Sequence, residues 1–450
     1  MKKPLLTCLI LLLYTTLNAQ RMLEERLDSL LNISVKPDMP GCALLVSRAG
    51  NIIYNKAFGR ASMELDVPLK PNMVFKIASI TKQFTAVATL KLAAEGKIDL
   101  ADSIQQYIPD FPVKSATIRI QHLLTHTSGI PDYMQLDFKT PYLERWDFKP
   151  AQLIDSFKTF PVEFQPGTQY RYSNSGYYLL GYIIERVSGK SYTSYVQDHL
   201  LKPLGLEHTY FDSTGTIIPN RVSGYRKEGA VYKNADFWSP TIAYAAGGLL
   251  STTEDLHQWM RGLLNFSILP KQYLEKAWTA NILADGIKTS YGYGWQINEP
   301  NGARSVEHGG HMNGFTSHLI YYPDDKITIA LLFNDEDAPR DELSRLVSET
   351  VLGKSLAGAG KVVSQDILDS YIGVYALTGD KNRAITVLKG KNGLIAKVSG
   401  QGELEILFSS ATQFQLKNIK DATGEFKLKD GKVASMIIRQ NGIFEWQKIK

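Results

Sequence analysis

The stretch from Phe75 to Gly96, FKIASITKQFTAVATLKLAAEG, constrains the fold more than any other part of the chain. Between residues 80 and 95 its charged side chains are Lys82, Lys91 and the terminal Glu95. A helix that is apolar on nearly every side is usually buried by its neighbours in the interior of a domain. The sequence therefore predicts a central helix that carries Lys82 into the interior.

A serine and a lysine, Ser79 and Lys82, stand three residues apart at the start of this helix. Side chains at that spacing lie on one face of a helix, and the positive end of the helix dipole lies at its N-terminus. The pair therefore places a nucleophile beside a base. Serine is also a common N-cap and a first-turn lysine is usually solvated, so the pair indicates catalysis only when further motifs accompany it.

The composition is that of a soluble globular protein with two or three domains. The chain has 450 residues, of which 44% are hydrophobic and 21% are charged. Its net charge of +5 is not gathered into a basic stripe with interleaved aromatic residues, the pattern that binds nucleic acid. We expect no nucleic-acid partner, no cofactor and no bound metal.

The first 19 residues are typical of a cleavable secretory signal peptide. Lys2 and Lys3 precede the apolar run Leu5–Leu13, and the small residue Ala19 ends the segment. The run is shorter than the roughly 20 apolar residues that a membrane helix needs, and we find no longer run downstream. The mature protein is expected to be secreted or periplasmic, without a membrane span.

The remaining cysteine of the mature chain, Cys42, lies in an apolar strand pattern and is expected to be a small buried hydrophobe.

Strand and helix patterns organise residues 20–355 as one domain. A short helical subdomain is expected from about residue 100 to 255, where short helical runs are separated by Pro, Gly and Tyr. Strand patterns flank this insertion on both sides, and we therefore expect an α/β domain with an antiparallel sheet that is flanked by helices and built from both ends of the domain. The expected strands are Cys42–Arg48, Asn51–Phe58, Ala303–Glu307, Phe315–Tyr322 and Ile327–Phe333.

The pattern changes beyond a small-residue linker at residues 356–364. Short alternating runs separated by Gly, Asn and Asp turns fill residues 365–450. Such runs predict a small all-β domain of the sandwich or barrel type.

Two more motifs lie downstream of the serine–lysine pair. Tyr172 and Asn174 stand on a loop before a helical run, and His308, Gly309 and Gly310 stand where a strand pattern ends. Glycines at a strand end let the backbone approach a ligand closely. Each motif has an ordinary structural explanation when it stands alone, but the three together are an improbable coincidence.

On these motifs the chain from about residue 22 to 355 resembles the serine β-lactamase-like superfamily. The resemblance is closest to class C β-lactamases, D,D-peptidases, and the related esterases and D-aminopeptidases. The segment that follows is similar to the lipocalin-like β domain that often accompanies such hydrolases. The resemblance implies the fold described above and a reaction that passes through an acyl-enzyme.

Carried over residue by residue, the resemblance also implies roles. Ser79 would be the nucleophile, and Lys82 and Tyr172 would be the pair that removes its proton. The sequence does not decide which of the two is the base at rest. Asn174 would hold the acyl-side amide of the substrate and Lys82. The backbone N–H groups of Ser79 and His311 would form the oxyanion hole.

The lysine base requires tuning by its surroundings. A lysine that acts near pH 7 needs a pKa about 3 units below its ordinary value. Burial in an apolar helix and a nearby cationic environment lower a lysine pKa, because desolvation and like charge both disfavour the ammonium form.

The third motif, His308, Gly309 and Gly310, is assigned to substrate binding and departs from the family pattern. β-Lactamases and D,D-peptidases typically have lysine at its first position, where the cation binds a substrate carboxylate. A histidine is mostly neutral at neutral pH, unless a partner such as Glu307 raises its pKa. We therefore expect hydrolysis of an amide or ester bond, in a D-amino-acid peptide, a peptidoglycan-type peptide or an ester, rather than efficient β-lactam turnover.

Alternative interpretations remain open at this point. His122 and His126 have helical spacing, and Glu307, His308 and His311 cluster elsewhere, but the pattern lacks the Glu of His-Glu-x-x-His. The chain has no Gly-x-Ser-x-Gly, which argues against an α/β-hydrolase. A β-lactamase, or a penicillin-binding or sensor protein without turnover, is the strongest rival. The partner is expected to be a small-molecule or peptide substrate, such as a peptidoglycan fragment. Substrate identity and oligomeric state are not indicated by the sequence.

Overall fold

The computed structural model forms two compact units. The first contains the chain up to Pro166 and Ser173–Lys354, and the second contains Gly167–Tyr172 and Ser355–Lys450. The signal peptide predicted at residues 1–19 and most of the linker predicted at 356–364 lie outside the described residues. The described residues are 20–112, 116–136, 143–356, 365–390, 393–398, 402–408, 412–417, 419, 422–429, 432–440 and 442–450.

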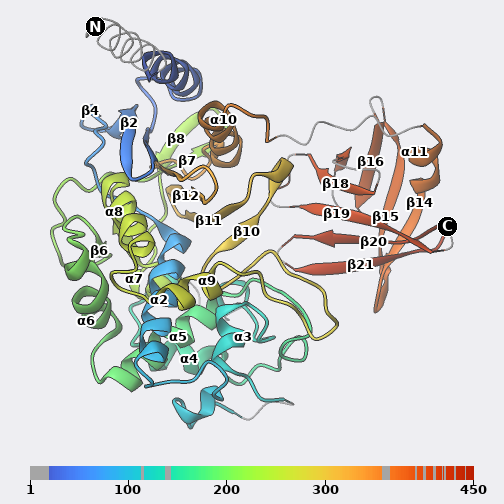
Figure 1. The fold of residues 1–450 in the computed structure, drawn as a ribbon, viewed down its shortest axis with the longest axis horizontal. Helices are drawn as coiled ribbons and strands as arrows, with labels where there is room; N and C mark the ends of the chain where they lie inside the picture. The colour runs from blue at the N-terminus through green and yellow to red at the C-terminus, as the bar shows by residue number, and fades with distance from the viewer. Residues whose placement is uncertain are drawn as a thin grey trace, which may run out of the picture. The chain divides into compact units, whose positions relative to one another are not determined.

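The first unit is built on a six-stranded sheet with the order β10-β11-β12-β13-β1-β2 (Figure 1). All of its pairings are antiparallel. The N-terminal strand β1 pairs with the C-terminal strand β13, so the sheet is assembled from both ends of the unit, as predicted. The strands are β1 (Cys42–Arg48), β2 (Asn51–Phe58), β10 (Gln296–Asn298), β11 (Ser305–Met312), β12 (Phe315–Tyr322) and β13 (Ile327–Phe333).

Strand β11 is longer than the sequence pattern indicated. Its ladder with β12 continues from Val306, opposite Tyr321, to Met312, opposite Phe315. The two glycines of the third motif therefore lie inside a paired strand and not at its end. The backbone hydrogen bonds of an antiparallel ladder do not depend on side chains, which is why the apolar pattern did not reveal the last residues of the strand.

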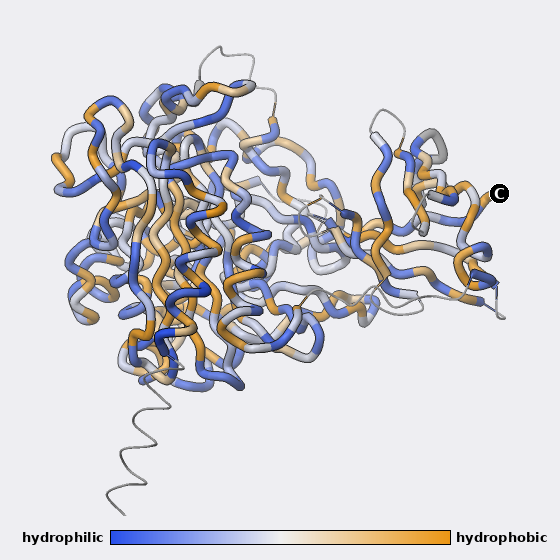
Figure 2. The backbone as a smooth tube through the Cα atoms, turned by 90° about the horizontal axis from the view of Figure 1, so that it is seen from above, coloured by the Kyte–Doolittle hydropathy of each residue, from blue (hydrophilic) through white to orange (hydrophobic). Residues whose placement is uncertain are grey.

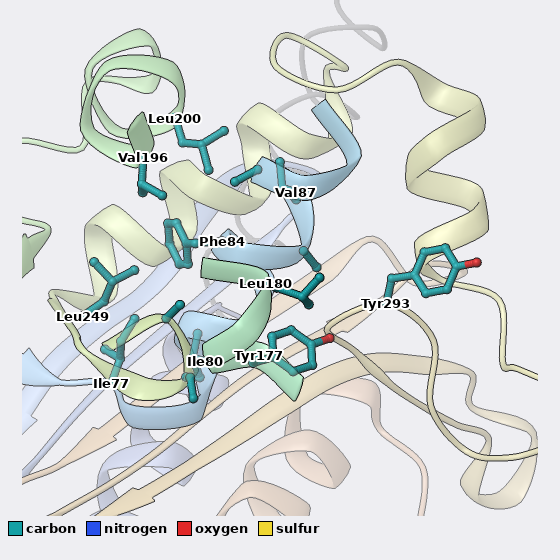
Figure 3. Packing of buried hydrophobic residues seen from close by; sticks show 14 of the residues in the cluster. Ile77, Ile80, Phe84, Val87, Tyr177, Leu180, Val196, Leu200, Leu249 and Tyr293 are labelled. Carbon is teal, nitrogen blue, oxygen red and sulfur yellow. The ribbon is translucent and has the colours of Figure 1, made fainter. Parts of the chain in front are cut away.

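Helix α2 (Thr81–Ala94) is the buried central helix that the sequence predicted. Eleven of its 14 side chains are buried, and Figure 3 shows Phe84 and Val87 among apolar side chains of neighbouring helices. Phe84 also stacks on Trp259, with ring centroids 3.9 Å apart. Gly96 follows the helix with a left-handed φ of +69°, the usual position of a terminating glycine.

The segment between the two halves of the sheet is largely helical, as expected, and also carries short strands. Strand β9 (Leu249–Ser251) lies between β5 (Phe75–Lys76) and β6 (Tyr210–Phe211), and β7 (Tyr225–Glu228) pairs with β8 (Val231–Asn234). The other strands and helices of the first unit include a helix at residues 20–34, β3 (Arg60–Ser62), β4 (Val67–Pro68), α3 (Ile120–Leu124), α4 (Pro150–Phe157), α5 (Asn174–Ser188), α6 (Tyr192–Val196), α7 (Pro240–Gly247), α8 (Thr253–Leu264), α9 (Lys271–Ala277) and α10 (Arg340–Leu352).

The second unit contains a closed barrel of eight antiparallel strands, β14 to β21. Its interior is filled by aromatic rings, and Tyr371 stacks on Phe426 with centroids 3.9 Å apart. The expectation of a small all-β domain is confirmed. Helix α11 (Gln365–Tyr371) precedes the strands, which are β14 (Gly373–Leu377), β15 (Asp380–Gly390), β16 (Gly393–Val398), β17 (Glu403–Phe408), β18 (Gln413–Leu416), β19 (Thr423–Lys429), β20 (Lys432–Arg439) and β21 (Ile443–Lys448).

Hydropathy follows burial in this fold. Figure 2 shows hydrophobic segments gathered in the interior of the first unit, where the sheet strands and α2 lie. Cys42 is fully buried in β1, as predicted, and burial raises the pKa of its thiol to about 12. Across the part of the chain that the structure describes, no helix combines the length and the apolar character needed to cross a membrane.

One buried amide joins three separate backbone segments beside the sheet. Asn334 is fully buried, and its Oδ1 accepts a hydrogen bond from the N–H of Gly41 at 2.6 Å. Its Nδ2 donates to the carbonyl oxygens of Arg60 at 3.0 Å and Ser223 at 2.8 Å. This side chain therefore forms hydrogen bonds to backbone groups of three separate segments.

We predict that Asn334→Ala lowers the free energy of unfolding by about 2–4 kcal/mol, because it leaves buried polar groups unsatisfied. The exposed Asn51 at the edge of the sheet is the matched control, and Asn51→Ala is expected to change stability by less than about 0.5 kcal/mol. Urea denaturation of both variants measures the difference. Equal stabilities would show that Asn334 does not hold these segments together.

Candidate active site

Ser79 lies in a single 3-10 turn, Ala78–Ile80, directly before α2. The residue before it, Ala78, has a φ of +46°, a conformation that costs a residue with a β-carbon about 1–3 kcal/mol. The surrounding structure holds the turn in place. The N–H of Ile77 donates to the carbonyl of Leu249 at 3.0 Å, and the hydroxyl of Ser317 donates to the carbonyl of Ile77 at 2.8 Å. Ser79 itself is only partly buried, so its hydroxyl lies at the edge of the core.

Lys82 is fully buried one turn further along. Its Nζ lies 3.2 Å from the Oγ of Ser79, 2.8 Å from the Oδ1 of Asn174 and 2.7 Å from the carbonyl oxygen of Ala246. The ring of Tyr177 lies beneath it, with 5.6 Å between Nζ and the ring centroid. The structure thus brings Asn174, which is 92 residues from Lys82 in the sequence, next to the Ser79 and Lys82 pair.

Burial lowers the pKa of Lys82 to about 7, and the negative charge of Asp132 opposes this decrease. A lysine with such a pKa is partly neutral at neutral pH, and a neutral amine can accept the proton of a serine hydroxyl. The apolar surroundings of α2 therefore supply the tuning that a lysine base requires.

The carbonyl group of Ala246, which accepts a hydrogen bond from Lys82, belongs to a distorted helix. Within α7, Tyr244 has φ 38° and ψ −125°, which interrupts the helix. The following carbonyl oxygens then face α2: that of Ala245 accepts from the Thr85 hydroxyl at 2.7 Å, and that of Ala246 accepts from the lysine. The hydroxyl of Tyr244 donates to Glu185 at 2.7 Å and anchors the distortion. Side chains of α2 thus donate hydrogen bonds to carbonyl groups of α7, and these bonds join the two helices.

His308 is buried in β11, and both of its ring nitrogens have partners. Its Nδ1 lies 2.7 Å from the carbonyl oxygen of Gly309, and its Nε2 lies 2.8 Å from the hydroxyl of Tyr291. A carbonyl oxygen only accepts, so Nδ1 carries a proton, while the tyrosine hydroxyl can donate to Nε2 or accept from it. The neighbouring Glu307 lies on the other face of the strand, 3.8 Å from Nε2 of His318. Glu307 is therefore not the partner that would raise the pKa of His308, because successive strand residues face opposite sides.

The two glycines of the third motif permit close packing inside the protein. A β-carbon at Gly310 would lie 2.2 Å from the Oγ of Ser317 and 2.3 Å from the carbonyl oxygen of Ile77. A β-carbon at Gly309 would lie 2.8 Å from the guanidinium of Arg340, which also donates to the carbonyl of Gly310 at 2.9 Å. Strand β11 therefore lies directly against the turn that carries the serine.

The other predicted site residues are placed as follows. Tyr172 ends the segment Gly167–Tyr172, which groups with the barrel unit, and Asn174 begins α5 two residues later. His311 follows the glycines in β11, opposite Thr316. The catalytic role of Tyr172 and the oxyanion role of the backbone N–H groups of Ser79 and His311 stay predictions.

Sequence analysis overlooked the contacts of Asp132 and His126. The Oδ2 of Asp132 accepts from the Nδ2 of Asn174 at 2.9 Å. The Nδ1 of His126 accepts from the backbone N–H of Ser173 at 3.2 Å, across 47 residues of sequence. The ring of His126 also packs edge-on against Tyr291, with centroids 4.6 Å apart. An aspartate at the start of a turn is usually interpreted as an N-cap alone. The sequence therefore did not indicate that Asp132 also contacts Asn174.

The two histidines considered as metal ligands have other partners. The Nδ1 of His122 accepts from the backbone N–H of Arg119 at 3.2 Å, and Nδ1 of His126 faces Ser173. Within the described ranges, no group of three or more His, Cys, Asp and Glu side chains is arranged to hold a metal ion.

Comparison with known proteins agrees with this arrangement. The family model described as Beta-lactamase matches residues 19–352, so the chain belongs to the Beta-lactamase family. It is 30% identical over 432 residues to Penicillin-binding protein 4* of Bacillus subtilis (strain 168), covering 89% of this chain and 92% of that protein.

Solved structures show the same fold. The octameric penicillin-binding protein homologue from Pyrococcus abyssi matches with a TM-score of 0.65 and 26% identity, over 93% of this chain and 99% of that chain. A D-stereospecific amidohydrolase from Streptomyces sp. matches with a TM-score of 0.63 and 26% identity, over 74% of this chain and 99% of that chain. The predicted β-lactamase-like fold is confirmed, and the closed barrel fits the expected lipocalin-like domain.

We predict that Gly310→Ala separates β11 from the serine turn, because the added methyl group has no space. We expect a stability loss of about 1–3 kcal/mol and at least about a 10-fold slower labelling of Ser79 by a fluorophosphonate probe, since a small displacement at a reacting centre is costly. Gly215→Ala is the matched control, because a β-carbon at Gly215 would meet nothing within 4 Å. Labelling at the wild-type rate in Gly310→Ala would contradict the close packing.

Proposed function

We propose that this protein is a secreted serine hydrolase that cleaves an amide or ester bond through an acyl-enzyme on Ser79. The observation that carries the proposal is the position of Lys82, whose Nζ lies 3.2 Å from Oγ of Ser79 and whose pKa burial lowers to about 7. A lysine buried beside the partly buried Ser79 does not stabilise the fold, because burying an amine costs free energy. Secretion follows from the signal peptide predicted at residues 1–19.

In the proposed reaction, Lys82 and Tyr172 remove the proton of Ser79 while its Oγ attacks the substrate carbonyl carbon. The backbone N–H groups of Ser79 and His311 stabilise the negative oxygen that forms. The proton then passes to the leaving amine or alcohol as the bond to carbon breaks, which leaves an ester on Ser79. A water molecule attacks that ester, and the proton it loses returns to Ser79 as the acid is released. Asn174 binds the acyl-side amide.

The burial of Lys82 supports its proposed role as a base at neutral pH. Lowering a lysine pKa by about 3 units corresponds to about 4 kcal/mol of preference for the neutral amine. Desolvation on α2 is the main cause of that preference. The carbonyl of Ala246 and the amide oxygen of Asn174 favour the ammonium form through hydrogen bonds, so they limit the decrease and keep the amine aimed at Ser79.

For the substrate, we propose an amide or peptide bond next to a D-amino acid. The relatives that support this are a penicillin-binding protein and a D-stereospecific amidohydrolase, whose matches cover 89% and 74% of this chain. A histidine at position 308, in place of the usual lysine, argues against efficient β-lactam turnover. A penicillin-binding protein without turnover is the second candidate, favoured by the 30% identity to Penicillin-binding protein 4*.

Intact-protein mass spectrometry tests the proposal. The protein is incubated separately with a penicillin, a p-nitrophenyl ester and a D-alanyl p-nitroanilide, and both adduct and released product are followed. Turnover of the anilide or ester without a lasting penicillin adduct supports the hydrolase. A stable penicillin adduct without turnover of the other two supports the second candidate.

We predict that Ser79→Ala abolishes acylation and that Lys82→Ala slows it by about 10²–10⁴-fold, the usual contribution of a positioned base. Lys91→Ala is the matched control, because Lys91 lies on the same helix and faces Glu95 at its end. This control is expected to react at the wild-type rate. Full turnover in Ser79→Ala would exclude the mechanism.

We predict that His308→Lys favours substrates that carry a free carboxylate, because a hydrogen bond from a cation to a carboxylate contributes about 1.5–3 kcal/mol. The measurement is the ratio of kcat/KM for a D-alanine-terminated peptide to that for the same peptide with an amidated end. The amidated peptide is the control, since loss of activity on both would report only damage to the site. We expect the ratio to rise about 10-fold, and an unchanged ratio would refute this role for position 308.

A further inference from the structure

We propose that Asp132 is a positioning residue for this reaction, and that its carboxylate fixes the orientation of the Asn174 side-chain amide so that the amide oxygen faces Lys82. The inference rests on the proposed function and adds a residue to it. Asp132 lies just before the turn Tyr133–Gln135 and reaches Asn174 at the start of α5.

The two carboxylate oxygens of Asp132 have different partners. Its Oδ1 accepts from the backbone N–H of Met134 at 3.2 Å and so caps the short turn. Its Oδ2 accepts from Nδ2 of Asn174 at 2.9 Å. The cap alone requires only one acceptor, which serine or asparagine would also supply. The second oxygen is therefore not needed for the cap. It can orient the amide of Asn174, because a carboxylate only accepts hydrogen bonds.

That task is to select one of the two orientations of an amide. An amide side chain presents a carbonyl oxygen on one side and an NH₂ group on the other, and the two are nearly equal in shape. An ionised carboxylate only accepts hydrogen bonds, so the NH₂ group of Asn174 must face Asp132. The Oδ1 of Asn174 then faces Nζ of Lys82, at 2.8 Å. The three residues form one chain of hydrogen bonds that ends at Ser79.

Asp132 also acts on Lys82 through its charge. The negative charge raises the pKa of Lys82 against the larger effect of burial. Burial in turn raises the pKa of Asp132, while hydrogen bonds from Met134 and Asn174 and the charge of Lys82 lower it. Other groups near the lysine include Ser79, the ring of Tyr177, and the buried His126, whose pKa is depressed by burial and then by Lys82 and His308.

The sign of the expected pH effect follows from these contacts. Without the carboxylate, Lys82 loses a nearby negative charge, and the Asn174 amide can turn its NH₂ group toward the lysine. Both changes disfavour the ammonium form, so the pKa of Lys82 falls. The acidic limb of kcat/KM, which reports a base that must be neutral, then moves to lower pH.

The experiment measures kcat/KM against pH for full-length wild-type protein, Asp132→Ser and Asp132→Asn. Asp132→Ser keeps an N-cap acceptor and loses the second oxygen. We expect kcat/KM at neutral pH to fall about 10–100-fold and the acidic limb to move down by about one pH unit. Asp132→Asn can still accept from Asn174, so we expect a smaller rate loss and a shift in the same direction.

Asp255→Asn is the matched control. Asp255 is also buried, and it accepts from the backbone N–H of His208 at 2.9 Å and from the hydroxyl of Thr209 at 2.7 Å. Its replacement removes a buried carboxylate from a different hydrogen-bond network. We expect it to lower thermal stability while the acidic limb stays at the wild-type pH.

Two outcomes would overturn the assignment. Ser79-dependent turnover with an unshifted acidic limb in both Asp132 variants would show that Asp132 only caps its turn, and the proposed function would stand. Turnover that survives in Ser79→Ala would remove the proposed function and this assignment with it. If Asp132→Ser does not fold, the pH profile of Asp132→Asn decides alone.

Discussion

The structure depends on one costly feature, the burial of the Lys82 amine in an apolar helix. Desolvation lowers the lysine pKa to about 7, and the polar contacts around Nζ prevent the amine from turning away from Ser79. Those contacts come from the start of α5 and from the distorted helix α7. A buried ionisable group lowers stability, and the extensive apolar core around α2 offsets that cost. The lowered pKa of the lysine beside Ser79 is thus a consequence of how the core is packed.

The sheet contributes by holding the serine turn in a strained conformation. Ala78 keeps its positive φ because Ile77 is hydrogen-bonded on both sides, to Leu249 and to Ser317. Strand β11 lies against the same turn, and Gly310 is required there because any β-carbon would collide with it. The strain and the close packing are local, and both position one hydroxyl. A replacement that removed the strain or the close packing would therefore lower activity more than it lowered the stability of the fold.

The main elements could be predicted from the sequence because they follow apolar patterns. The charge-free run around Lys82 indicated the buried helix, and strand patterns at both ends of the first unit indicated the sheet. The contacts of Asp132, His126 and Arg340 could not be predicted, because each reaches a residue distant in sequence and leaves no periodic trace. Hydrogen bonds of this kind are specified by tertiary structure alone. The pairing of Glu307 with His318 was missed for the same reason.

The most direct test of the central claim is the pH dependence of single-turnover acylation of wild-type protein by a p-nitrophenyl ester. In the proposed mechanism, the burst of p-nitrophenol reports the step in which Ser79 loses its proton. A buried Lys82 that acts as the base predicts an acidic limb with an apparent pKa of about 7, below which acylation slows 10-fold per pH unit. An acidic limb near the ordinary lysine value of about 10.4, or a rate that does not depend on pH around neutrality, would contradict the account.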